Sequence, residues 1–117
     1  MSTTDRELLE LAAKAAGLQV EWRERRTGRV AEFGCIKYQT ISGFMVGATP
    51  WNPITDDGDA LRLAVKLRLF PYLMLMGKSI GFDEIDMYIR EEFEQDPYAA
   101  TRRAIVRAAA AIGEKMP

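Results

Sequence analysis

The sequence contains no histidine and a single cysteine. Histidine is the commonest general base and the commonest metal ligand in proteins, so its absence excludes Ser–His–Asp and Cys–His catalytic sites as well as His-based zinc sites. The single cysteine, Cys35, cannot form a disulfide within the chain or build a cysteine-based metal site, and it is ordinary for a reducing cytoplasm. Because Cys35 stands in an apolar run, we interpret it as a core residue rather than a reactive thiol.

The chain also lacks an excess of either charge and lacks a long apolar run. It has 16 lysines and arginines against 17 aspartates and glutamates, a formal net charge of −1, so no global field attracts it to nucleic-acid polymers or anionic membranes. No apolar run approaches the ~20 residues of a membrane span. The N-terminal stretch "MSTTDRELLELAAKAAG" does not have the basic start and apolar centre of a signal peptide. We therefore expect a cytoplasmic protein without membrane contact.

What the chain does contain is enough apolar sequence for one domain. With 117 residues and 48% hydrophobic residues, it is predicted to fold as a single domain over residues 1–117. Residues 4–17 have the pattern of a first helix. Thr4 and Glu7 have the spacing of a capping box, an apolar stripe follows, and Gly17 suits a left-handed C-terminal cap.

A second helix is predicted from about Asp56 to Arg68, after the stretch "TPWNPIT". Thr55, Asp56 and Asp57 can accept hydrogen bonds from the first free backbone N–H groups, and their negative charge suits the positive end of the helix dipole. Pro53 prevents a preceding strand from continuing. The residues expected to face the core are Ala60, Leu61, Ala64, Val65 and Leu67.

A third helix is predicted from the N-cap Asp96, with Pro97 at the first helical position, to Gly113. Between the helices the pattern changes to strands. "LQVEW" and "GRVAEFGCI" flank the charged turn "RERRTG" and predict a β-hairpin, and "GFMVGA" (43–48) predicts a further strand. Residues 69–94 favour two strands around a glycine-containing turn, but the segment "IDMYIREEF" also fits helical spacing, so a short helix is the alternative.

Three segments carry a family resemblance: "DRELLELAAKAAG" (5–17), "WNPITDDGDALRLAVKL" (51–67) and "DPYAATRRAIVRAAAAIGE" (96–114). They resemble the phage ABA sandwich family of small tailed-phage and prophage proteins. The resemblance covers most of the chain, whereas 19–47 and 68–94 carry no matching motif. It implies an α+β fold in which an antiparallel sheet of about four to five strands packs against three α-helices. It also implies an accessory phage protein of the host bacterial cytoplasm.

The strongest candidate binding site is the predicted hairpin, where four arginines gather beside a tryptophan: Trp22, Arg23, Arg25, Arg26 and Arg29. Guanidinium groups and an aromatic face can hold a phosphate and a base together. Arg25, Arg26 and Arg29, with Trp22, are therefore candidate ligand-binding residues. The alternative is a solvated hairpin tip whose charge is partly neutralised by Glu21 and Glu24.

Trp51 and Asn52 are the second pair of candidate ligand-binding residues, because an aromatic ring ahead of a helix start can stack on a ligand. The alternative is a hydrophobic staple that packs on the first turn of the helix. The neighbouring aspartates Asp56, Asp57 and Asp59 are interpreted as capping residues rather than metal ligands, because a calcium loop needs more oxygen ligands and a distal glutamate.

The basic side chains Arg102, Arg103 and Arg107 of the third helix form another cationic surface, and the alternative for them is pairing with the acidic run "EEFEQD". The segment "GKSIG" does not complete a phosphate loop, because Tyr72 occupies the position where that motif requires glycine. No catalytic residue, metal or cofactor is expected.

These patterns lead to a functional hypothesis. Some small phage proteins of comparable build act against host immunity, including as sponges that sequester nucleotide signals. By this analogy we expect a non-enzymatic phage accessory protein that binds an anionic nucleotide in a pocket completed by oligomerisation. The alternative is an inhibitor or adaptor that binds a host protein without any small ligand. The alanine-rich third helix and the run "FPYLMLM" predict a homo-oligomer, because monomers seldom expose large apolar patches.

Overall fold

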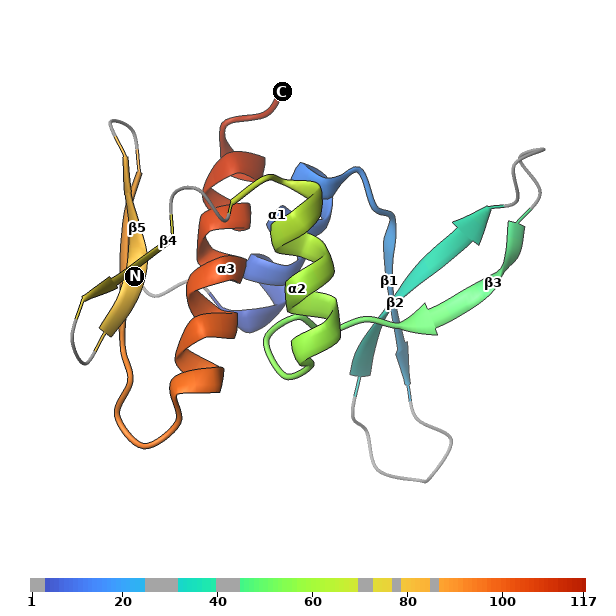
Figure 1. Cartoon of the computed structure of the whole chain (residues 1–117). Helices are drawn as coiled ribbons and strands as arrows, with labels where there is room; N and C mark the ends of the chain where they lie inside the picture. The colour runs from blue at the N-terminus through green and yellow to red at the C-terminus, as the bar shows by residue number, and fades with distance from the viewer. Residues whose placement is uncertain (1–3, 25–31, 40–44, 70–72, 77–78, 85–86) are drawn as a thin grey trace.

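The structure is a computed structural model that describes residues 4–24, 32–39, 45–69, 73–76, 79–84 and 87–117, with side chains described at 4–22, 50–69, 81 and 89–117. The described residues form three helices and six strands (Figure 1). In chain order these are α1 (Asp5–Ala16), β1 (Val20–Glu24), β2 (Glu32–Gln39), β3 (Met45–Pro50), α2 (Asp57–Lys66), β4 (Leu73–Met76), β5 (Ser79–Glu84), β6 (Met87–Glu92) and α3 (Pro97–Glu114). No helix among these residues is long and apolar enough to cross a bilayer.

Helix α1 begins and ends where its sequence predicts. The Thr4 hydroxyl accepts a hydrogen bond from the Glu7 backbone N–H at 3.2 Å, which satisfies one of the free donors of the first turn. At the other end Gly17 has φ 72°, the left-handed conformation that glycine adopts without a steric penalty, and its N–H returns to the last turn. Both predicted caps of α1 are therefore confirmed.

Helix α3 also begins as predicted. The Asp96 carboxylate accepts hydrogen bonds from the N–H groups of Tyr98 and Ala99, at 3.0 and 3.1 Å, and Pro97 occupies the first turn. The predicted end at Gly113 is wrong, because the helix continues to Glu114 and Gly113 lies inside it. A Cβ at Gly113 would collide with the Leu11 carbonyl of α1, so this glycine allows a close helix crossing rather than a helix end.

The core forms mainly between helices of the same chain. Small side chains let α1 and α3 approach closely, since an alanine face presents little more than backbone. The fully or nearly fully buried residues of this contact are Leu8, Leu9, Ala12, Ala13 and Ala16 of α1 and Ala104, Ile105, Val106, Ala108, Ala109 and Ala110 of α3. The alanine face of α3 is thus covered within the chain, and this part of the reasoning for a homo-oligomer is wrong.

Two separate antiparallel sheets flank the helices, with strand orders β1-β2-β3 and β4-β5-β6. In the first, Trp22 pairs with Gly34 and Ile36 pairs with Thr49, with an irregularity between Tyr38 and Gln39. The predicted hairpin is confirmed by the β1–β2 pairing. In the second sheet β6 is a strand paired with β5, so the helical alternative for this segment is wrong.

The β4–β5–β6 sheet packs directly on α3, through β5 and β6 (Figure 1). Ile89 of β6 is buried in the core. Gly81 of β5 is buried too, and a Cβ there would collide with the Ile89 carbonyl and the backbone of Arg90, so only glycine fits.

The β1–β2–β3 sheet, here named the β1–β3 arm, projects away from the helices on the opposite side of the molecule (Figure 1). The described contacts of its backbone with the helices are few, and among the described side chains Val20 and Trp22, at the base of the arm, pack against the core. The chain then returns to the core through Trp51, just after β3.

The predicted fold, an α+β sandwich with one sheet of four to five strands against three helices, is therefore wrong. The helices pack on one another in the centre, and the strands divide into two sheets with different surroundings. The physical reason is local pairing: each set of three strands is joined by short connections and hydrogen-bonds within itself, while α2 separates the two sets along the chain.

Candidate functional site

The turn before α2 is held by Asn52. The Asn52 side-chain oxygen accepts a hydrogen bond from the Ile54 N–H at 3.0 Å, and its carbonyl accepts from the N–H groups of Thr55 and Asp56 at 3.1 and 2.9 Å. The Asn52 N–H donates to the Asp59 carboxylate at 2.9 Å. This is the Asx-turn chemistry that asparagine favours, and it fixes the path of the chain into the helix. In the structure the polar groups of Asn52 form hydrogen bonds that hold this turn.

The three aspartates at the start of α2 all have partners. The Asp56 carboxylate accepts from the Asp59 N–H at 2.8 Å and is the N-cap, as predicted. The buried Asp59 accepts from the Arg62 guanidinium at 2.7 Å in addition to the Asn52 N–H. No group of three metal-ligating side chains comes together among the described residues. The capping interpretation of Asp56 is confirmed.

Trp51 lies in the core with 4% of its surface exposed, and its ring has no open face for stacking on a large ligand. It forms one wall of a small cavity of about 190 Å³ between α1 and α2. The other residues that line this cavity are Ala16, Leu18, Arg62, Leu63 and Lys66. The main contacts of Trp51 are therefore packing contacts in the core, in line with the alternative interpretation of this residue.

Trp22 attaches the β1–β3 arm to α1. Its indole N–H donates to the Glu10 carboxylate at 3.0 Å, and the Arg6 guanidinium carbon lies 4.6 Å from the centre of its ring, within cation–π range. The tryptophan is half-buried and engaged on α1. The other candidate ligand-binding residues of the hairpin, Arg25, Arg26 and Arg29, lie outside the described residues, so their contact with a phosphate stays a prediction.

Two of the three α3 arginines pair with the acidic run that precedes the helix. The Glu91 carboxylate lies 3.4 Å from Arg103 and 3.2 Å from Arg107, and Arg103 also contacts Asp5 of α1 at 3.1 Å. The pairing alternative is therefore confirmed for Arg103 and Arg107. Through these contacts Arg103 and Arg107 connect α3 to β6, and Arg103 also connects α3 to α1.

Arg102 has a different partner from its neighbours. Its guanidinium donates to the Ile54 carbonyl at 2.8 Å and to the Asp57 carboxylate at 2.6 Å, and only 17% of its side chain is exposed. The Asp57–Arg102 pair therefore joins the start of α2 to the middle of α3. It sits at one end of a groove between these two helices.

This groove has a volume of about 330 Å³ and a mainly apolar lining. The residues that line it are Asp57, Ala60, Leu61, Tyr98, Thr101, Arg102 and Ile105. Three large apolar side chains in and beside it are more exposed than buried, at 54% for Leu61, 59% for Val65 and 72% for Tyr98. We name this surface the α2–α3 face.

The spacing of Leu61 and Val65 predicts that they face the core, and the structure shows that this prediction is wrong. The buried side of α2 is formed by Ala60, Leu63 and Ala64, so the apolar stripe is wider than the surface that α3 can cover. Tyr98 is missed altogether. The signal in the sequence of α2 is that Leu61 and Val65 lie beside Ala60, Leu63 and Ala64, so that the apolar residues cover more of the helix than the buried side needs.

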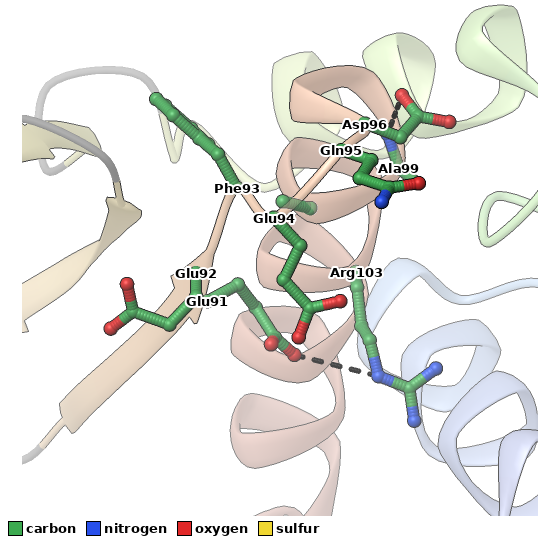
Figure 2. A pocket seen from close by; sticks show the side chains of 9 residues that line it. Glu91, Glu92, Phe93, Glu94, Gln95, Asp96, Ala99 and Arg103 are labelled. Carbon is green, nitrogen blue, oxygen red and sulfur yellow. Dashed lines mark hydrogen bonds and ion pairs between the residues drawn. The ribbon is translucent and has the colours of Figure 1, made fainter.

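A larger hollow of about 670 Å³ lies between the end of β6 and the start of α3 and is rich in carboxylates. Figure 2 shows the Glu91 and Glu94 carboxylates directed toward Arg103, while Glu92 points to the other side of the strand. Asp96, at its rim, is occupied in capping α3. Since Glu91, Arg103 and Asp96 are engaged within the chain, this hollow indicates a braced turn more than a binding site.

The structure thus brings Trp51 and Asn52 together in one turn and holds Trp22 separately on α1. Among the residues whose side chains the structure describes, the exposed large apolar side chains gather mainly at the α2–α3 face. Comparisons with protein-family models, with curated proteins and with solved structures find no match to this chain.

Proposed function

We propose that the chain is a non-enzymatic binding protein that works by protein–protein contact through the α2–α3 face. The observation that carries the proposal is the exposure of Leu61 and Tyr98 in the lining of one groove, with the exposed Val65 one helical turn after Leu61 on α2. Single apolar residues are common on protein surfaces, but a contiguous exposed patch beside a hollow often marks a contact surface.

The chemistry of the face fits a polypeptide partner. Tyrosine is enriched in protein interfaces because it combines a large apolar ring with a polar hydroxyl. Ala60 and Ile105 line the groove, where an apolar side chain of a partner can insert, and the Asp57–Arg102 pair offers polar contacts at one end. An amphipathic helix laid along the groove is the mode of recognition that such a surface supports best.

The resemblance to small phage proteins supplies the setting of the proposal. In that setting the chain is an accessory protein that acts as an inhibitor or adaptor on a host protein in the bacterial cytoplasm. This function is preferred over nucleotide sequestration because Trp22 and Trp51, the two rings considered for base stacking, are engaged in packing.

Binding of an anionic nucleotide is the second candidate, and one observation favours it. The small cavity beside Trp51 is lined by two cationic side chains, Arg62 and Lys66, and an aromatic ring. Its volume of about 190 Å³ is below the roughly 300 to 1,000 Å³ of typical ligand pockets, so a whole nucleotide does not fit without movement. A nucleotide present at a hundredfold its Kd should stabilise the fold by about 2.7 kcal/mol, which thermal unfolding would reveal.

Site-specific photo-cross-linking in bacterial cells tests the proposed function. A photo-reactive phenylalanine analogue placed at position 61 should form adducts with another polypeptide. The same analogue at position 114, an exposed residue at the end of α3, is the matched control and should form far fewer. Adducts in equal yield from both positions, or none from position 61, would overturn the proposal.

A further inference from the structure

The cavity of about 190 Å³ beside Trp51 is separate from the α2–α3 face. Its lining takes Arg62, Leu63 and Lys66 from α2, and none of these residues lines the groove of that face. At about 100° per residue, Lys66 lies about 140° around the helix from Leu61. Helix α2 thus borders two hollows on different sides, and the proposed function uses only one of them.

This cavity has the size of a small organic molecule. An apolar cavity of roughly 150 Å³ is large enough to hold benzene, so about 190 Å³ leaves room for one ring with a short substituent. The apolar part of the lining consists of the Trp51 ring with Ala16, Leu18 and Leu63. A single ring or a branched alkyl chain therefore fits this space in both size and chemistry.

The two cationic residues of the lining differ in their partners. The Arg62 guanidinium lies 2.7 Å from the Asp59 carboxylate and 3.9 Å from that of Asp56, so acidic groups of α2 already balance its charge. Lys66 is exposed, and its ammonium makes no hydrogen bond or ion pair with the part of the chain that the structure describes. The cavity thus has one positive charge at its opening that the described residues do not balance.

Trp51 adds a second donor. The residue is 4% exposed, and its indole N–H has no acceptor among the described residues. No side-chain nitrogen or oxygen among them is both fully buried and without a partner, so this N–H must lie in the small accessible part of the residue. A tryptophan N–H that is removed from bulk water usually has a hydrogen-bond partner. An acceptor bound in the cavity that the ring lines would supply one.

We infer that this cavity binds a small organic monoanion that consists of one ring or branched alkyl chain and one carboxylate. The apolar group lies between Leu18, Leu63 and the Trp51 ring. The carboxylate accepts hydrogen bonds from the Lys66 ammonium and the Trp51 indole N–H, since its two oxygens have room for several donors. The inference goes beyond the proposed function, because it uses no residue of the α2–α3 face.

An NMR titration of the full-length protein with benzoate, phenylacetate and isovalerate is the first test. The Trp51 indole N–H is the reporter, and Trp22→Phe assigns its signal because the chain has only two tryptophans. At least one acid should shift this signal saturably while that of Trp22 stays in place. Benzamide, the uncharged counterpart of benzoate, should bind about fivefold more weakly than the acids that bind. No shift with any acid, or benzamide binding as tightly as benzoate, would overturn the inference and leave cross-linking from position 61 unaffected.

Two variants test the residues of the cavity. Lys66→Gln should weaken binding of the tightest acid about fivefold. Lys14→Gln removes the same charge from an exposed residue outside the lining and should leave the affinity unchanged. Leu18→Trp enlarges a half-buried residue of the lining and should abolish binding, while the amide spectrum without ligand confirms that the variant is folded. Equal affinities for wild type and Lys66→Gln, or equal losses in the two lysine variants, would overturn the inference.

Discussion

The two sheets of this protein have the same number of strands and the same antiparallel order, yet their surroundings differ. The β4–β5–β6 sheet packs on α3 and contributes Ile89 to the core, whereas the β1–β3 arm leaves the core after Trp22 and returns to it at Trp51. The difference arises from the connections. A short turn over residues 93–96 leads β6 directly into α3, so that strand and helix fold onto each other. The pattern of a strand specifies pairing, but it does not specify what covers the sheet.

Trp51 is the residue through which the arm joins the core, and its replacement has the largest expected effect. Trp51→Ala should lower the free energy of unfolding by about 3 to 5 kcal/mol, because it removes a large buried ring and leaves a cavity. Denaturant unfolding measures this loss. Trp51→Phe, which keeps an aromatic ring, should cost clearly less. A loss below about 1 kcal/mol for Trp51→Ala would show that the joint is not part of the core.

Gly81→Ala tests the packed sheet. The new methyl group would collide with the Ile89 carbonyl, so the substitution should destabilise the protein by about 1 to 3 kcal/mol. Gly58→Ala on α2 is the control, since a methyl group there meets only the side-chain ends of Arg62 and Asp56, at 3.2 to 3.3 Å, and alanine favours helix. We expect that control to be neutral or stabilising in thermal unfolding. Equal losses for both variants would contradict the packing of β5 on β6.

Substitutions at the start of α2, the helix that follows the arm, should have a smaller effect on stability. Replacement of Asp56 and Asp57 together by alanine should lower stability by about 1 to 2 kcal/mol, since one carboxylate caps α2 and both favour the helix dipole. Denaturant unfolding and cross-linking from position 61 are measured side by side. Unchanged stability would contradict the capping of α2 by Asp56, and unchanged cross-linking would show that partner binding does not need Asp57 at the α2–α3 face.

The smallest expected effect is at the attachment of the arm to α1. Trp22→Phe keeps a ring over Arg6 and removes the hydrogen bond to Glu10, so the expected loss is about 0.5 to 1.5 kcal/mol. Glu10→Gln, which keeps an oxygen acceptor for the indole N–H, should cost less. If Trp22→Phe is as destabilising as Trp51→Ala, the arm is attached more firmly than its few contacts indicate.

The helices could be predicted from the sequence because their ends depend on local chemistry. Thr4, Gly17, Asp56 and Asp96 act on backbone groups within a few residues of themselves, and each caps a helix as expected. The sheets could be predicted as strands but not as two separate layers, because pairing and cover depend on residues far away in the chain.

The candidate site was harder to predict for the same reason. Tryptophan is a residue type that can stack on a ligand, but only the tertiary structure shows that Trp22 and Trp51 are both engaged in packing. Leu61 and Val65 have the spacing of core residues, and only the position of α3 shows that they are exposed. Residue type and spacing therefore indicate what a side chain can do, while the packing of the helices decides where it does so.

Hydrogen exchange of the backbone amides of β2 and β5, the central strands of the two sheets, tests the central claim most directly. We expect β5 to be protected much more strongly than β2, because β5 packs on α3 whereas the described contacts of the arm with the helices are few. If β2 is protected as strongly as β5, the two sheets do not differ in their attachment to the core and the claim is contradicted.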